Sequence, residues 1–293
     1  MIRGSVIASG KWLHKYCTLP DWDVPINIDS LWSASKGDCK AASLRYFIEC
    51  AKSAEAIAMN NSANVLLMGD FQDIHILNKA RKYDGIFSVL PFKNFCRDIK
   101  ALDNFLIKII NKSQVWATVT PIFDKAIAHN RMPPSFLITE RIRYHPKILN
   151  HILRSKDIFD LLVARASILL GSFSSELLSL EKGNLALSNI NLVANGKSTK
   201  LEGRAYKGNL DFRFTFSVSS ELHNIPFQVV DEKETNYLLS PYWDQDHPKI
   251  LLSAFRQFLT SIASEQEKKY RNMQIEILRI AIQLAKLYNL HDK

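Results

Sequence analysis

The sequence predicts an α+β protein in which helices come first, an antiparallel sheet follows, and helices end the chain. Apolar residues recur at helical spacing through much of the first 180 residues, and apolar and polar residues alternate in segments between 185 and 239. Helical spacing returns from residue 249. We expect one domain over residues 1–293, because no linker, internal repeat or low-complexity tract interrupts the chain.

The N-terminal part is predicted to begin as a packed arm and to continue as helices. Residues 1–36 carry Pro20, Pro25 and several aromatic residues, a composition typical of irregular chain. A first helix is expected from Cys39 to about Met59, where two asparagines end it. Further helical segments are expected at 73–83, 92–110 and 146–153, and short apolar runs stand at 65–68 and 86–90.

The rest of the chain combines a long helix, a group of strands and a helical end. The longest apolar helix is predicted over residues 157–180, and its single arginine and its serines indicate a buried helix and not a membrane span. Turn dipeptides separate the expected strands. These strands are expected at 185–193, 198–206, 210–218, 226–230 and 236–239, and two helices at 249–288.

Composition limits the classes of partner. The 38 basic and 29 acidic residues give a net charge of +9, which is compatible with nucleic acid, an anionic membrane surface or an acidic partner protein. The basic residues are spread out, however, and no basic run with interleaved aromatics marks a nucleic-acid groove. We therefore expect no nucleic-acid partner, while contact with a membrane surface stays open.

Four cysteines in 293 residues are too few for a disulfide scaffold, and none forms a C-x-x-C pair or has zinc-ligand spacing with histidine. We expect a reducing, cytosolic environment, no metal site and no cofactor. The first eleven residues are too weakly apolar for a signal peptide. A bacterial export signal that is not cleaved would escape this criterion.

Cys39 is the strongest candidate for a reactive residue. It follows Asp38, a preferred N-cap, so a helix is expected to begin at Cys39 or within one residue of it. The positive end of the helix dipole favours a thiolate, which is the nucleophilic form of cysteine. The next turns carry apolar residues that would anchor this helix in a core, namely Ala41, Ala42, Leu44, Phe47 and Ile48. The structural alternative is that Cys39 serves only as a small buried apolar residue.

His223 is the candidate base because of the segment that follows it. Residues 223–240 are expected to form a strand, a charged turn and a returning strand that ends at Ser240. In an antiparallel pair, His223 and Ser240, or a carboxylate such as Asp244 or Asp246 just beyond, would lie within hydrogen-bond reach. Such a partner could orient the imidazole.

The motifs around Cys39 (Gly37-x-Cys39-x-x-x-Ser43-x-x-Tyr46) and around His223 (His223 with Tyr237-Leu-Leu-Ser240-Pro241-Tyr242) resemble those of papain-like cysteine proteases of the Yersinia outer protein T and AvrPphB type, which are bacterial effectors. The resemblance implies a papain-like fold with Cys39 as nucleophile and His223 as general base. Residues 92–180 would then be a helical insertion or subdomain.

The residue expected in the third catalytic role differs from that of the family. Ser240 stands where the family has aspartate, so the role falls to Ser240, to Asp244 or Asp246 shifted along the loop, or to no residue. The oxyanion would be stabilised by the Cys39 backbone N–H with Ser33 or the Trp32 indole N–H.

Other motifs are interpreted as ordinary structure. Residues 196–199, Gly-Lys-Ser-Thr, lack the upstream glycine of a phosphate-binding loop and are interpreted as a hairpin turn. Asp70, Asp73 and His75 could bind a metal, but a helix cap with its first turn explains them equally well.

The sequence therefore leads to a thiol hydrolase hypothesis. The expected activity is that of a cysteine protease or a related deamidase or acyltransferase, a virulence effector secreted into host cells that acts on a host protein. The alternative is a non-catalytic interaction protein that binds an acidic protein or a membrane surface. Substrate identity and oligomeric state are left open.

Overall fold

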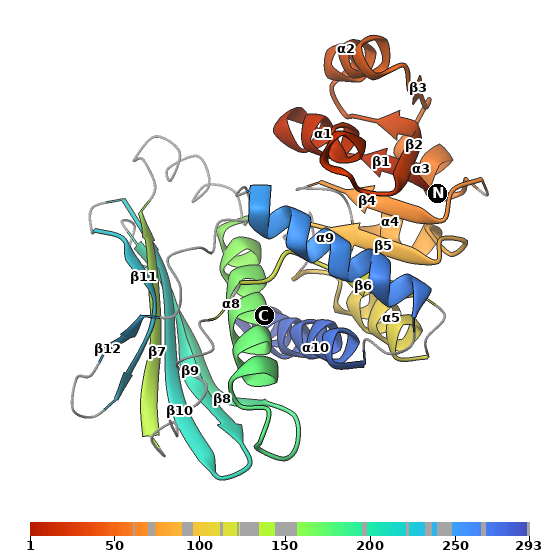
Figure 1. Ribbon diagram of the computed structural model, residues 1–293. Helices are drawn as coiled ribbons and strands as arrows, with labels where there is room; N and C mark the ends of the chain where they lie inside the picture. The colour runs from red at the N-terminus through yellow and green to blue at the C-terminus, as the bar shows by residue number, and fades with distance from the viewer. Residues whose placement is uncertain are drawn as a thin grey trace. The chain divides into compact units, whose positions relative to one another are not determined.

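The computed structural model describes residues 1–60, 62–69, 74–89, 96–111, 114–121, 123, 135–143, 157–194, 198–220, 223–231, 236–238, 248–264 and 268–291. The chain divides into two compact units. Unit 1 comprises Met1–Val119 and Leu251–Arg271, and unit 2 comprises Thr120–Ile250 and Asn272–Lys293. Each unit contains one sheet with its own helices (Figure 1).

Unit 1 contains a parallel sheet with the strand order β3-β2-β1-β4-β5-β6. Its strands are β1 (Ile2–Ile7), β2 (Ile26–Trp32), β3 (Glu49–Cys50), β4 (Val65–Met68), β5 (Gly85–Ser88) and β6 (Val115–Ala117). The connecting helices are α1 (Gly10–Cys17), η1 (Leu19–Trp22), α2 (Lys36–Tyr46), α3 (Ala54–Ala58), α4 (Ile74–Lys79) and α5 (Ile99–Ile110), and α9 (Pro248–Ala263) joins this unit from Leu251 on.

Burial explains why these short segments become strands. All residues of β4 and of β5 are buried, as are the last four of β1. Parallel strands that are covered on both faces have such uninterrupted apolar runs, without alternation. Phe87 of β5 meets Tyr16 of α1 and Phe255 of α9 edge-on. Gly85 allows this close packing, because a Cβ there would lie 2.5 Å from Ile262 of α9.

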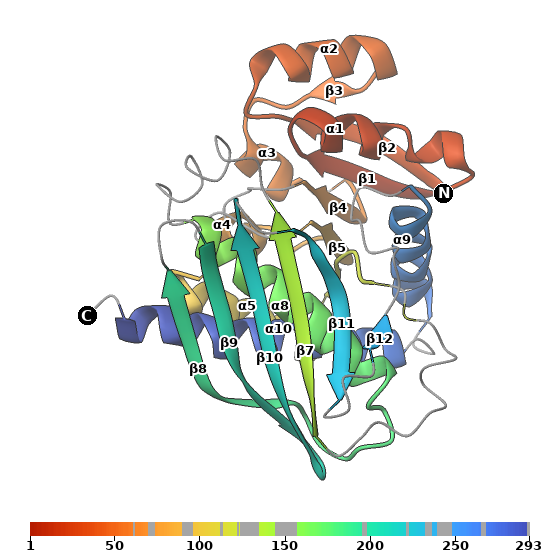
Figure 2. The ribbon, with the colours of Figure 1, turned by 90° about the vertical axis from the view of Figure 1, so that its left-hand side faces the viewer.

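Unit 2 contains a mixed sheet with the order β12-β11-β7-β10-β9-β8. Its strands are β7 (Ser135–Arg143), β8 (Ala186–Ala194), β9 (Ser198–Lys207), β10 (Leu210–Ser219), β11 (Ile225–Asp231) and β12 (Asn236–Leu238). β7 and β10 are parallel, and the other neighbouring pairs are antiparallel. Helices α8 (Asp157–Glu176) and α10 (Lys268–His291, in this unit from Asn272) lie on one side of the sheet (Figure 2).

The core of unit 2 lies between the sheet and α8. Phe136 of β7 stacks on Phe212 of β10 with ring centroids 4.5 Å apart, and Phe173 of α8 packs edge-on against both rings. An ion pair between Arg165 of α8 and Glu140 of β7 adds a hydrogen bond of 2.6 Å from Nη2 to Oε1. By length and composition Ile158–Glu176 could cross a membrane, but 83% of the apolar window is buried inside the protein, as in the core helix of a globular unit.

The predicted fold class, papain-like α+β, is wrong. Residues 1–36, predicted as an irregular arm, contain β1, α1, η1 and β2. The helix predicted over 39–59 is α2, which ends at Tyr46 because Phe47 adopts a left-handed conformation, with φ of 56°. The strand β3 and the short helix α3 then follow. Residues 92–180, predicted as a helical insertion, are divided between the two units.

Several element predictions for unit 2 and the C-terminus are confirmed. The strands expected between 185 and 239 are β8 to β12, and the expected buried helix over 157–180 is α8. The two C-terminal helices are α9 and α10. The helix expected at 146–153 lies outside the described residues.

Candidate functional site

The parallel sheet has a switch point between β1 and β4. The chain moves from β1 to β2 and β3 on one side, and then returns to place β4, β5 and β6 on the other side. Loops that leave the carboxyl ends of β1 and β4 therefore diverge, and in open α/β sheets ligands bind in the crevice that this divergence creates. The turn after β1, Ala8 to Gly10, lies at this point and leads directly into α1.

Close backbone packing fixes the turn after β1. The Ala8 N–H donates to the Trp32 carbonyl over 3.1 Å, and the Gly69 N–H after β4 donates to the Ile7 carbonyl over 2.8 Å. A Cβ at Gly69 would lie 2.8 Å from the Ala8 Cβ and 3.1 Å from the Trp12 Cβ. The glycine therefore allows the end of β4 to pack against the turn.

Gly10 leaves the start of α1 open. It has a φ of 50°, and a Cβ built on it would meet no atom within 4 Å. The preceding Ser9 makes no side-chain cap hydrogen bond, and the first turn of α1 contains no acidic residue. The partial positive charge of a helix N-terminus is thus available to an anion that approaches over Gly10.

The carboxyl end of β2 presents hydroxyl groups and a cation. Ser33 is 4% exposed, and its Oγ accepts a hydrogen bond from the Ser35 N–H over 3.3 Å. Ser35 caps α2, because its Oγ accepts from the Asp38 N–H over 3.2 Å. Lys36 is the first residue of α2, and no carboxylate stands between β2 and α2.

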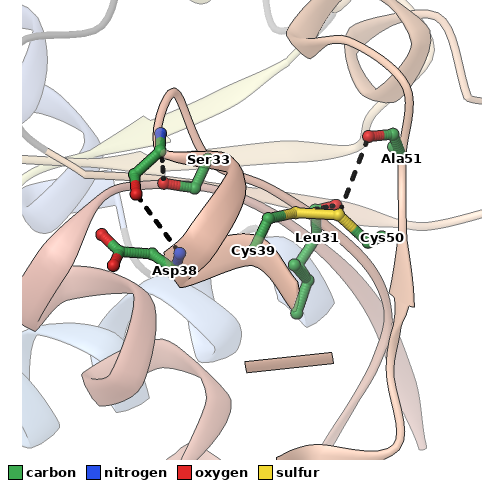
Figure 3. Close-up of a disulfide and its surroundings, with 7 residues drawn as sticks. Leu31, Ser33, Asp38, Cys39, Cys50 and Ala51 are labelled. Carbon is green, nitrogen blue, oxygen red and sulfur yellow. Dashed lines mark hydrogen bonds between the residues drawn. A yellow bond between two sulfur atoms is a disulfide. The ribbon is translucent and has the colours of Figure 1, made fainter. Parts of the chain in front are cut away.

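Cys39, the predicted nucleophile, forms a disulfide with Cys50 of β3 (Figure 3). It is the fourth residue of α2 and not the first, because Ser35 caps the helix instead of Asp38. Its side chain is buried beside the carbonyl of Leu31. Of the apolar residues expected to anchor this helix, Leu44 and Phe47 are exposed. A sulfur in a disulfide is not a nucleophile, because the reactive form of cysteine is the thiolate.

The remaining predicted site residues are not brought together in one unit. Trp32 and Ser33 lie in unit 1, at the end of β2. His223 belongs to unit 2, where it is exposed and precedes β11. Ser240, Asp244 and Asp246 lie outside the described residues. No group of three potential metal-ligating side chains is found in the described part of the chain.

The two cysteines outside the disulfide are both buried. Cys17, in the last turn of α1, is buried, and this burial raises its thiol pKa to about 12. Cys96 is also buried. At neutral pH Cys17 is therefore protonated and unsuited to nucleophilic attack.

The turn after β1 preserves part of the dinucleotide-binding fingerprint G-x-G-x-x-G, which follows the first strand of such sheets. Its sequence here is Ala8-Ser9-Gly10-Lys11-Trp12-Leu13, so only the second glycine is present. That position allows the backbone to approach a pyrophosphate. This site is not evident from the sequence, because two of the three glycines are replaced and the pattern does not reveal β1. The sequence signal that could have indicated the site is an apolar run that ends just before Gly10, followed by the start of a helix.

Solved structures that are similar to this chain include dehydrogenases and a reductase. Myo-inositol dehydrogenase from Lactobacillus casei, determined with NAD(H) and myo-inositol, has a TM-score of 0.68 and 9% identity over 100% of this chain and 96% of that chain. UDP-N-acetylglucosamine 3-dehydrogenase from Acidithiobacillus ferrooxidans has a TM-score of 0.62 and 12% identity over 97% of each chain. Biliverdin reductase from Synechocystis, determined with biliverdin and NADP+, has a TM-score of 0.60 and 9% identity over 97% and 98%.

The chain shares the fold of these dehydrogenases and of biliverdin reductase. The likeness is one of fold, since the identities are between 9% and 12% for the three proteins above. No protein-family model and no curated protein sequence matches the chain.

This likeness overturns the resemblance to papain-like proteases. The parallel sheet with its switch point is not a papain-like fold, and the hydrolase, thiol protease and effector predictions are corrected with it. The predicted host-protein substrate is likewise contradicted, because the neighbours bind small molecules and NAD(H). The alternative of a non-catalytic interaction protein is supported no better. The short motifs around Cys39 and His223 matched by residue type, without the three-dimensional context that such motifs require.

Proposed function

We propose that this protein is a nicotinamide-dependent oxidoreductase that transfers a hydride between NAD(P) and a small-molecule substrate. The observation that carries the proposal is the open Gly10 turn at the switch point of a sheet with the order β3-β2-β1-β4-β5-β6. Inositol, UDP-sugar and biliverdin are substrates named for proteins of this fold, and they indicate a small molecule, without identifying one for this chain.

The residues of the turn fit a dinucleotide despite the two replaced glycines. Ala8 does not have the positive φ that would require glycine, and Leu13 is fully buried in the packing of α1. Gly69 supplies the close approach between β4 and this turn. The backbone N–H groups at the start of α1 would hold the pyrophosphate, and the bound cofactor would supply the hydride chemistry.

The end of β2 favours a cofactor with a 2′-phosphate. In dinucleotide sites an acidic residue at this position binds the ribose 2′-hydroxyl of NAD, whereas a cation accommodates the 2′-phosphate of NADP. Here Ser33, Ser35 and Lys36 occupy the segment, and the next carboxylate along the chain is that of Asp38, inside α2. We therefore expect NADP(H) to bind more tightly than NAD(H).

The proposed activity fits the cytosolic part of the environment expected from the sequence, whereas the disulfide between Cys39 and Cys50 does not fit its reducing part. Nothing supports secretion into a host cell, since that expectation depended on the effector resemblance. The partner of this chain is then a small substrate and a dinucleotide.

Two glycine variants test the proposal with a matched control. Gly10 and Gly183 both have positive φ, and neither has an atom within 4 Å of a built Cβ. An alanine at either position would have to adopt a positive φ, so both variants carry a backbone cost. Gly10→Ala should weaken NADPH binding tenfold or more, measured by nucleotide fluorescence, because the new methyl group blocks the approach of the pyrophosphate. Gly183→Ala, in unit 2, should bind as the wild type does.

Two results would reject the proposal. One is the absence of saturable NADPH and NADH binding by the wild-type protein. The other is an equal affinity of the two alanine variants for NADPH.

A further inference from the structure

One face of the sheet in unit 2 is left bare by the described helices. Helices α8 and α10 lie behind the sheet in Figure 2, and the strands β7 to β10 face the viewer. The side chains that alternate towards the helices are buried, such as Phe212, Phe214 and Phe216 of β10. The side chains between them, including Arg213 and Thr215, point to the opposite face.

Two arginines stand directly opposite each other on this open face. Arg213 of β10 pairs in register with Arg204 of β9, and like charges in facing positions destabilise a sheet. Arg204 has a partner, because its Nη2 lies 2.5 Å from Asp211 Oδ2. The nearby cation of Lys200 is paired with Glu202. Arg213 is exposed, and none of the described carboxylates forms an ion pair with it.

A hollow of about 350 Å³ lies beside these arginines. Its lining includes the charged residues Lys200, Arg204 and Arg213 together with Glu202, and the polar residues Asn191 and Thr215. The volume falls within the range of about 300–1,000 Å³ that is typical of small-ligand sites. Lys200 is paired with Glu202 and Arg204 with Asp211, so Arg213 supplies the unbalanced positive charge of this lining.

An irregularity of β8 shapes the rim of the hollow. The register of β8 against β9 shifts between Ser188 and Asn191, and Asn189, which also lines the hollow, has a φ of 49°. A bulge turns side chains out of their regular alternation, and a non-glycine residue in this conformation stores strain that is often associated with a binding site. The bulge thus places two carboxamide groups beside the cations.

We propose that this hollow binds a small anionic ligand through a phosphate or carboxylate group held by Arg213. The planar guanidinium can donate two parallel hydrogen bonds to either group, and the bound charge would relieve the repulsion between Arg213 and Arg204. Asn189, Asn191 and Thr215 would supply neutral hydrogen bonds around it. The site lies within unit 2 and does not depend on the proposed dinucleotide site in unit 1.

The test measures the binding of inorganic phosphate and of citrate to the full chain, through the NMR resonance of the Arg213 Nε–H. Phosphate also occupies dinucleotide sites, so the titration is repeated with saturating NADPH. We expect saturable shifts in both conditions, and the anion that binds more tightly identifies the preferred group.

Calorimetry on three variants tests the role of Arg213. Anion binding should be at least tenfold weaker for Arg213→Gln, and the loss should be intermediate for Arg213→Lys. Binding should not change for Lys182→Gln, which removes an exposed cation outside the hollow.

Three results would overturn this inference. The first is the absence of a saturable shift of the Arg213 resonance with either anion. The second is unchanged anion binding by Arg213→Gln. The third is a wild-type dimer by light scattering that Arg213→Gln converts to a monomer, because the face would then be an interface between two copies.

Discussion

At the level of single residues, the bond between Cys39 and Cys50 joins α2 to the edge strand β3 across 11 positions. The disulfide lies next to the end of β2, where the hydroxyl groups of Ser33 and Ser35 accept hydrogen bonds at the start of α2. A link across such a short loop stabilises the folded state mainly by restricting the unfolded chain. This pairing was not expected from four scattered cysteines, because spacing in the sequence does not reveal which sulfur atoms meet.

A thiol assay in denaturant tests this disulfide. Without reductant the purified protein should expose two reactive thiols, those of Cys17 and Cys96, and with reductant it should expose four. Cys50→Ser should lower the free energy of unfolding by about 2–3 kcal/mol without reductant, as chain entropy predicts for so short a loop. With reductant the variant and the wild type should be nearly equal. Four thiols in the untreated protein would contradict the pairing.

The burial of Lys207 makes the free energy of unfolding depend on pH. Its Nζ donates to the Ser174 carbonyl over 2.6 Å near the end of α8, and burial lowers its pKa below the ordinary 10.5, opposed by Glu276 and Glu181. Between the lowered folded pKa and 10.5 the unfolded chain binds more protons than the folded one, so stability from this group rises with pH. Urea unfolding across that window should show a steeper rise for the wild type than for Lys207→Met. Equal slopes would show that the lysine is not buried.

At the level of elements, α8 and α10 cross at a glycine. A Cβ at Gly171 would lie 2.9 Å from the Ile277 Cα and 3.0 Å from its backbone nitrogen. Backbone atoms cannot move aside as the end of a flexible side chain can, so the two helices would have to separate. The small side chain at residue 171 therefore sets the distance between the two helices that cover the sheet of unit 2.

Alanine substitutions at two helical glycines separate packing from helix propensity. Gly171→Ala should lower the free energy of unfolding by about 1–3 kcal/mol, because overpacking outweighs the gain in helix propensity. At Gly37 of α2 the only atom near a built Cβ is Ser35 Oγ at 3.9 Å, so Gly37→Ala should be neutral or stabilise by up to about 1 kcal/mol. Urea unfolding measures both. A Gly171→Ala protein as stable as Gly37→Ala would refute the close crossing.

The elements of unit 2 could be predicted from the sequence because each is long and has a clear period. The alternation in β10, with Phe212, Phe214 and Phe216 buried, is visible directly in the sequence. Strands β4 and β5 of unit 1 are short and buried on both faces, so they have no alternation and appear in the sequence only as apolar runs. Short apolar runs do not distinguish a strand from a helix segment.

At the level of the whole molecule, the order of strands in unit 1 could not be predicted, and the site depends on that order. Without β1 and β2, the chain looked like helices followed by an antiparallel sheet, which is also the order of papain-like enzymes. The dinucleotide-binding fingerprint is not apparent in the sequence, because Ala8 and Leu13 replace two of its three glycines. Trp32 and Ser33, predicted as oxyanion donors, do lie at a candidate site, but that site is the end of β2 in a parallel sheet.

The most direct measurement is a crystal structure of the protein grown with NADPH. We predict density for the pyrophosphate against the backbone N–H groups at the start of α1, over Gly10, with the 2′-phosphate beside Ser33 and Lys36. Crystals saturated with NADPH that show no nucleotide at the turn after β1, or that show it elsewhere on the chain, would contradict the proposed cofactor site.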